Sequence, residues 1–377
     1  MRSRTLAALA AGAILAAPTA AQADVFNGRI SFSSFRTDPA GSTGDIFTIN
    51  DDGTDLRQLT TNPEDDAQSD WAPDGRDLAY RIRKPGQRTN FEVSRMTAAG
   101  EGITRLTFTP DGQASSQPTW WPDRSRLLFR RSGPGVSSLW TMGTGGEEPA
   151  LLFDPPADQF YPSVSPDSSR LLFATVKSPT GDTDRAIETM PAGGGDVTTL
   201  LDFPGAFDSA PAWSPDGKRI AFESNLDVFG GNPTHDMEIW VMDADGAHAT
   251  MLTSNRLHDE GPAWSPDGTL LAYSSGADNL HVDINVMTAD GTHRRTLTDY
   301  AGRDESPDWQ PIPAPDTDRR CGEFRASRLS CRRARRLAER WADGRRLRRW
   351  DVEAEDFGGV TRVILARHRK LVTFLAN

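Results

Sequence analysis

The chain has 377 residues, a formal net charge of −11 at pH 7 and only two cysteines, Cys321 and Cys331. Two cysteines without a nearby histidine do not make a zinc site. No apolar stretch beyond the N-terminal segment is long enough to span a bilayer, so we expect no transmembrane segment.

The N-terminal residues have the pattern of a secretory signal. Arg2 and Arg4 supply the positive region, residues 6–17 form a short apolar run, and residues 21–23 are an A-x-A cleavage site. We therefore expect residues 1–23 to be a signal peptide that is cleaved near Ala23. The mature chain is expected to be secreted, or to reside in the periplasm or cell envelope, and because no cysteine follows the signal we expect no lipoprotein anchor.

A turn pattern built on tryptophan, proline, aspartate and glycine recurs through the main part of the chain, at intervals of 44 to 51 residues. We call its first residue the anchor. The six anchors are Trp71 (WAPDG), Trp120 (WWPDR), Val164 (VSPDS), Trp213 (WSPDG), Trp264 (WSPDG) and the truncated Trp309 (WQP). A repeat of this length is typical of supersecondary units stacked into a propeller or an array.

Each repeat has the pattern of four strands. After the anchor, apolar residues such as Ile220 and Phe222 stand two positions apart, which places both on one face of a strand. Further along, a turn glycine has an apolar residue four positions before it and a leucine six positions after it. The six turn glycines are Gly53, Gly100, Gly146, Gly194, Gly246 and Gly291.

These counts predict an all-β fold over residues 24–313, a six-bladed β-propeller with four-stranded antiparallel blades. The chain would begin on the second strand of a blade and end on the anchor strand at Trp309. That last strand would then complete the blade begun by the first three strands. Pairing of the two ends would close the ring and leave no long exposed sheet edge.

The repeats "PAWSPDGKRIAFESN" and "PAWSPDGTLLAYSS" resemble those of the TolB-like, WD40-like β-propeller family. The resemblance covers residues 24–313 and does not include the α/β domain that precedes the propeller in TolB proteins. The most direct interpretation is an exported, non-catalytic propeller that binds a protein, a peptide or a cell-envelope component through its channel face.

Acidic residues recur at the positions five residues before the anchors. Four of these six positions hold aspartate, and glutamate follows two of the four aspartates. We expect these side chains to ring one mouth of the central channel. The candidate ligand-binding or cation-binding residues are Asp66, Asp208, Asp259, Glu260, Asp304 and Glu305. Converging carboxylates could coordinate Ca²⁺ or receive a basic partner segment. The alternatives are a solvated acidic rim and side chains that bond to backbone amides at the ends of loops.

His258, beside Asp259 and Glu260, is the only grouping that indicates metal or acid–base chemistry. It would suit a metal-assisted carbohydrate lyase or lactonase with its site in the channel. The six histidines do not share a repeat position, however, so a non-catalytic role is favoured and no catalytic residue is assigned. Ca²⁺ in the channel is the one candidate cofactor.

A linker at residues 314–320 precedes a small basic α+β module at 321–377. Residues 319–377 hold 17 Arg and Lys against 7 Asp and Glu, a charge of +10, whereas residues 24–318 carry −23. We expect a helix over 330–342, followed by strands at Val352, at 360–365 and at 371–375. In an oxidising compartment, Cys321 and Cys331 are expected to form a disulfide.

The charge asymmetry leaves several interpretations of the module open. Its arginines could form a solvated helix face, dock on the acidic ring, or bind an anionic wall polymer or membrane headgroup. Nucleic acid is not an expected partner of an exported protein. We expect the protein to be a monomer.

Overall fold

The computed structural model describes residues 25–38, 41–87, 90–135, 137–178, 184–227, 231–232, 234–278, 280–313, 320–321, 324–327, 351–356, 361–367 and 370–376. The predicted signal peptide, the predicted helix at 330–342 and Cys331 lie outside these residues.

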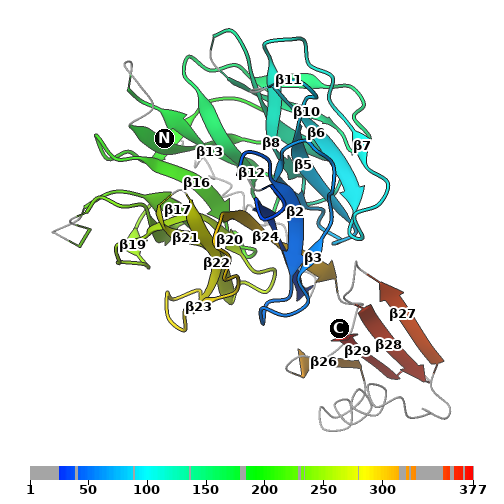
Figure 1. Ribbon diagram of the computed structural model, residues 1–377. Coiled ribbons are helices and arrows are strands. Elements are labelled where there is room, and N and C mark those ends of the chain that lie inside the picture. The colour runs from blue at the N-terminus through cyan, green and yellow to red at the C-terminus, as the bar shows by residue number, and fades with distance from the viewer. Residues whose placement is uncertain are drawn as a thin grey trace, which may run out of the picture.

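Six four-stranded antiparallel sheets form the blades, in agreement with the predicted propeller (Figure 1). In order from the channel outward, the first blade contains β4 (Asp66–Trp71), β5 (Asp77–Arg83), β6 (Phe91–Thr97) and β7 (Thr104–Arg105). The second contains β8 (Ala114–Trp120), β9 (Arg126–Ser132), β10 (Ser138–Gly143) and β11 (Ala150–Phe153). The third contains β12 (Gln159–Val164), β13 (Arg170–Val176), β14 (Arg185–Pro191) and β15 (Thr198–Leu201).

The fourth blade contains β16 (Asp208–Trp213), β17 (Arg219–Ser224), β18 (Glu238–Asp243) and β19 (Thr250–Met251). The fifth contains β20 (His258–Trp264), β21 (Leu270–Asp278), β22 (His281–Thr288) and β23 (Arg295–Thr296). The sixth combines the two ends of the ring, with β24 (Asp304–Pro313) beside β1 (Val25–Ser34), β2 (Asp45–Ile49) and β3 (Arg57–Gln58). Pairing of Trp309 with Ile30 and of Asp304 with Ser34 confirms the predicted closure.

The repeated residues hold neighbouring blades together. The anchors and the apolar residues before the turn glycines are buried, for example Trp120 at 4% exposed and Met142 at 1%. All six turn glycines have positive φ, between 82° and 90° for five of them and 79° for Gly100. Four of the turn glycines lie against the repeat leucine of the preceding blade. A Cβ atom added to any of these four glycines would lie 3.1 Å or less from the carbonyl oxygen of that leucine. The shortest such distance is 2.4 Å, between a Cβ at Gly246 and the carbonyl oxygen of Leu200. The turn glycine and the leucine that recur in the sequence are therefore in contact in the structure, across the boundary between two blades.

A separate five-stranded antiparallel sheet contains the C-terminal strands in the order β25 (Arg320–Cys321), β26 (Phe324–Ser327), β29 (Lys370–Ala376), β28 (Thr361–Arg367) and β27 (Asp351–Asp356). The strands predicted at Val352, at 360–365 and at 371–375 correspond to the last three of these in the sequence. Among the described residues, no helix is long and apolar enough to cross a membrane.

Candidate functional site in the central channel

A backbone irregularity is repeated in the inner strand of every blade. The third residue before each anchor has positive φ, between 45° and 61°; the six are Gln68, Gln117, Tyr161, Ala210, Gly261 and Ser306. The pairing register with the second strand shifts at the same place in all six blades. Such a shift is a β-bulge, which inserts one unpaired residue and re-aims the side chains around it. Five of the six residues are not glycine, so the surrounding fold imposes this conformation.

The bulges are tied to side chains of the preceding blade. The N–H of Tyr161 donates to Oε1 of Gln117 at 2.9 Å, and the N–H of Gly261 donates to Oε2 of Glu223 at 2.8 Å. The N–H of Gln68 donates to Oγ of Ser33 at 3.2 Å. The N–H of Ser306 donates to Oγ of Ser274 at 3.1 Å. These four contacts satisfy backbone donors of the bulges in β4, β12, β20 and β24, and they connect each of these inner strands to the preceding blade.

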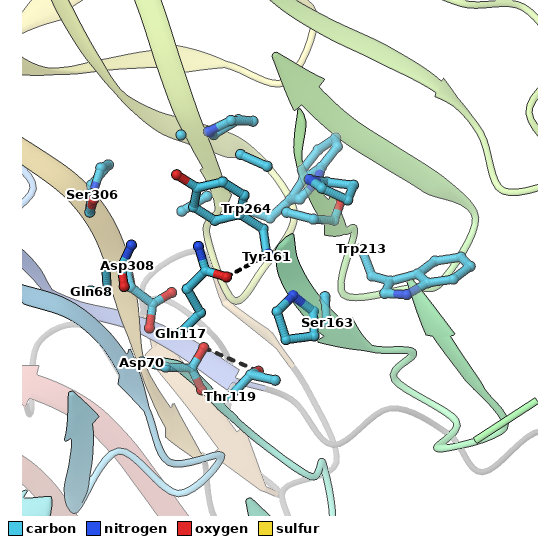
Figure 2. Close-up of a pocket in the computed structure, with 18 of the residues that line it drawn as sticks. Gln68, Asp70, Gln117, Thr119, Tyr161, Ser163, Trp213, Trp264, Ser306 and Asp308 are labelled. Carbon is cyan, nitrogen blue, oxygen red and sulfur yellow. Dashed lines mark hydrogen bonds between the residues drawn. The ribbon is translucent and has the colours of Figure 1, made fainter. Parts of the chain in front are cut away.

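A cavity of about 290 Å³ lies inside the bulge ring and is lined by residues from all six inner strands (Figure 2). Its lining is divided into two halves. The polar half, from β24, β4, β8 and β12, presents Gln68, Asp70, Gln117, Thr119, Ser163, Ser306 and Asp308. The apolar half, from β16 and β20, presents Ala210, Ala212, Gly261 and Ala263. Tyr161 also contributes to the lining and is drawn beside Trp264.

Two carboxylates in the polar half stand directly before anchor tryptophans. Oδ2 of Asp308 accepts a hydrogen bond from the N–H of Trp71 at 2.7 Å, and Oδ2 of Asp70 accepts one from the N–H of Trp120 at 2.8 Å. Withdrawal from bulk water raises the pKa of Asp308 to about 7. Burial, together with the charge of Asp308, raises the pKa of Asp70 well above its usual value. The two acids therefore resist being ionised together at neutral pH.

The aspartates five residues before the anchors take a different position. Asp66, Asp208, Asp259 and Asp304 are fully buried at the starts of their inner strands and do not line the cavity. Their carboxylates accept hydrogen bonds from Asn62, Ser224, Asn255 and Arg36, respectively. Burial raises the pKa of Asp66 and that of Asp208 to about 7. A binding role for these four residues stays a prediction.

The two candidate glutamates are more accessible than the aspartates. Glu260 is exposed, and Glu305 is partly exposed and forms an ion pair with Arg303. Glu223 is buried, and burial raises the pKa of its carboxyl group to about 7. The negative charge of Glu260 contributes to the same increase. Burial raises the pKa of Tyr161, and the charges of Glu223 and Glu260 act in the same direction.

His258 does not join Asp259 in a common site. Its Nε2 atom lies 3.7 Å from Oδ1 of Asp236, whereas Asp259 is buried. Within the described part of the chain, no three His, Cys, Asp or Glu side chains are arranged to hold a metal ion. The proposals of Ca²⁺ in the channel and of metal-assisted catalysis stay predictions, as does the disulfide of Cys321 and Cys331.

Sequence reasoning missed the bulge ring and the two cavity aspartates. The only signal for the bulges was Gly261, since the other five positions hold residues that rarely adopt positive φ. Asp70 and Asp308 carried a clearer signal, because both precede an anchor tryptophan at a position where the other repeats have Thr, Ser or Ala.

Comparison with known proteins agrees with the propeller assignment. A family model described as the TolB beta propeller domain matches residues 112–313. An uncharacterized protein of Agrobacterium fabrum is 29% identical over 160 residues, which are 40% of this chain and 52% of that protein. The Tol-Pal system protein TolB of Anaeromyxobacter dehalogenans is 31% identical over 146 residues, 37% of this chain and 29% of that protein. The matched region thus spans about half of the first relative and less of the second.

Solved structures show the same fold. TolB from Acinetobacter baumannii superposes with a TM-score of 0.63 at 19% identity, over 75% of this chain and 66% of that one. A putative TolB from Agrobacterium tumefaciens gives a TM-score of 0.55 at 21% identity, over 78% of this chain and 100% of that one. The repeats, the closed ring of six blades and the matching family model lead to one conclusion: this chain belongs to the TolB beta propeller domain family.

Proposed function

We propose that this protein is exported and binds a segment of another protein or a peptide in its central channel. The cavity of about 290 Å³ inside the bulge ring is the observation that carries the proposal. Binding sites are typically concave, with apolar walls and a few placed polar groups. Here the hydroxyls and amides of the polar half could bond to a peptide backbone, while the small residues of the apolar half leave room for side chains.

The family relationship supports a binding role. One relative is named as a protein of the Tol-Pal system, and assembly of this chain with envelope proteins of a comparable kind is part of the proposal. The signal pattern at residues 1–23 supports export. Mass spectrometry of the protein recovered from the cell envelope or medium would test this part, with a mature N-terminus at Asp24 as the expected result.

A plugged channel tests the binding role. Ser163 lines the cavity and is drawn in Figure 2, so Ser163→Trp should fill much of the space, whereas Ser163→Ala should leave it open. The mature protein and both variants would be immobilised and exposed to a cell-envelope extract. We expect the wild type and Ser163→Ala to retain the same protein, identified by mass spectrometry, and Ser163→Trp to lose it.

Folding must be equal in all three proteins, which circular dichroism and thermal unfolding would establish. If a folded Ser163→Trp variant retains the same proteins as the wild type, binding does not use the channel and the proposal is wrong.

A further inference from the structure

The six bulge residues bound the cavity on the side where the inner strands begin, and their side chains differ in length. The long side chains come from the consecutive strands β4, β8 and β12, and the short ones come from β16, β20 and β24. The long ones are Gln68, Gln117 and Tyr161, and the short ones are Ala210, Gly261 and Ser306. Tyr161 is thus the one aromatic residue of this boundary and its largest side chain.

The ring of Tyr161 points into the cavity and is drawn beside Trp264 in Figure 2. Its backbone is fixed, because the N–H donates to Oε1 of Gln117 at 2.9 Å. Its hydroxyl has no hydrogen-bond partner among the described residues, and the side chain is partly exposed. Tyrosine hydroxyls usually find a partner when they are buried. The contacts of Tyr161 therefore hold its backbone and leave its ring able to change rotamer.

Open space adjoins the boundary at Gly261. A Cβ atom added to Gly261 would have no heavy atom within 4 Å, apart from its neighbours in the chain. The equivalent residue of the preceding blade, Ala210, carries only a methyl group. Two consecutive positions of the boundary after Tyr161 are therefore small, so its ring can turn in their direction without displacing a strand.

We propose that Tyr161 is a gate to the cavity, whose ring obstructs entry in the present conformation and turns towards Gly261 when a peptide segment enters. This inference rests on the proposed function and concerns how access to its site is regulated. Because Tyr161 carries the largest side chain of the boundary, its removal should open the cavity. A side chain that fills the space at Gly261 should keep the gate closed.

The reaction of a cysteine placed inside the cavity measures access through the gate. Ser163 lines the cavity two residues beyond Tyr161 on the same strand. Ser163→Cys would be introduced into the whole mature protein, with Cys321→Ser and Cys331→Ser so that only the new thiol reacts. Mass spectrometry would follow its alkylation by N-ethylmaleimide in this reference protein and in further variants of it.

Replacements at the gate should change the alkylation rate in opposite directions. Tyr161→Ala should increase it at least tenfold, whereas Tyr161→Phe keeps the ring and should stay within twofold of the reference. Gly261→Leu should lower the rate at least threefold, because the leucine fills the space into which the ring turns. Its positive φ does not forbid this change, since the five equivalent positions carry side chains. Tyr300→Ala is the matched control, because it removes a tyrosine outside the lining and should leave the rate unchanged.

Circular dichroism and thermal unfolding would verify that the variants are folded, and either Tyr161→Ala or Gly261→Leu tests the gate if the other does not fold. Equal rates in the reference protein and a folded Tyr161→Ala variant would overturn the proposal, as would an unchanged or faster reaction in Gly261→Leu. Its failure is distinguishable from failure of the proposed function. If capture from the envelope extract depends on an open channel at Ser163 but alkylation does not depend on residue 161, the channel binds its partner without a gate.

Discussion

The backbone N–H of Trp71 donates a 2.7 Å hydrogen bond to the carboxylate of Asp308, 237 residues away in the sequence. Asp308 belongs to the strand that closes the ring, and Trp71 is the anchor of the next blade. A second link of this kind joins the N–H of Trp120 to Asp70. Side chains of the channel wall thus connect successive blades in addition to the strand pairing of β24 with β1.

Replacement of Asp308 should separate the effect of its hydrogen bond from that of its charge. At pH 5, Asp308→Ala leaves the N–H of Trp71 without its acceptor and should lower the free energy of unfolding by about 1–3 kcal/mol, whereas Asp308→Asn keeps an acceptor. Urea unfolding would measure both. Equal stability of the two variants would show that the bond to Trp71 does not contribute to ring closure.

The close contact of Gly246 with Leu200 predicts an unusually sensitive turn. Gly246 has φ of 90°, and a Cβ there would lie 2.4 Å from the carbonyl oxygen of Leu200. Gly205 has a similar φ of 82° but open space around it. Gly205→Ala should therefore cost only the roughly 1–2 kcal/mol of a left-handed residue, and Gly246→Ala should cost clearly more. Thermal unfolding of the two variants compares them, and equal losses would contradict the contact argument.

Burial of Asp66 predicts a dependence of stability on pH. Its pKa is raised to about 7 from the usual 3.8, so the native state binds more protons than the unfolded state between these values. The contribution of Asp66 is therefore most favourable below about pH 4, is lost as pH rises towards 7, and is constant above it. The change is on the order of 4 kcal/mol.

Asp66→Asn should remove this part of the pH dependence and make the protein more stable than the wild type at pH 8. Denaturant unfolding at pH 5 and pH 8 measures it. Asp290→Asn is the matched control, because hydrogen bonds lower the pKa of this exposed carboxylate to about 2, outside the tested window. If both variants show the same pH dependence as the wild type, Asp66 is not the titrating group.

Replacement of the buried Arg29 should destabilise the protein much more than replacement of the partly exposed Arg57, although both form an ion pair with Asp55. Its side chain is fully buried, bonds to Thr48 and Asn50 at 3.0 and 2.9 Å, and forms a 2.9 Å ion pair with Asp55. Arg29→Met removes this donor from the buried side chains of Thr48 and Asn50 and should cost about 3 kcal/mol. Arg57 binds the same aspartate but is 41% exposed, so Arg57→Met should cost less than about 1 kcal/mol. Urea unfolding tests the order, and a reversed order would contradict it.

The sequence by itself determined the architecture. The anchors, the apolar pairs two residues apart, and the turn glycines with their leucines each report a local requirement of a strand, a turn or a blade contact. The same requirement recurs in every blade. Six copies therefore fixed the number of blades, and the truncated copy at Trp309 fixed how the ring closes. Gly246 and Leu200 illustrate why this succeeded, since both signals arise from a single contact that is repeated around the ring.

Only the tertiary structure decided which carboxylates face the channel. In a regular strand, residues five and one before an anchor lie on the same face, because side chains alternate with a period of two. The bulge at Gln68 and its five equivalents adds one residue to each inner strand and exchanges the faces beyond it. Asp66 is consequently buried, while Asp70 lines the cavity. Hydrogen bonds from bulge N–H groups to side chains of the preceding blade support this shift at Gln68 and Tyr161, and neither residue type indicates a bulge in the sequence.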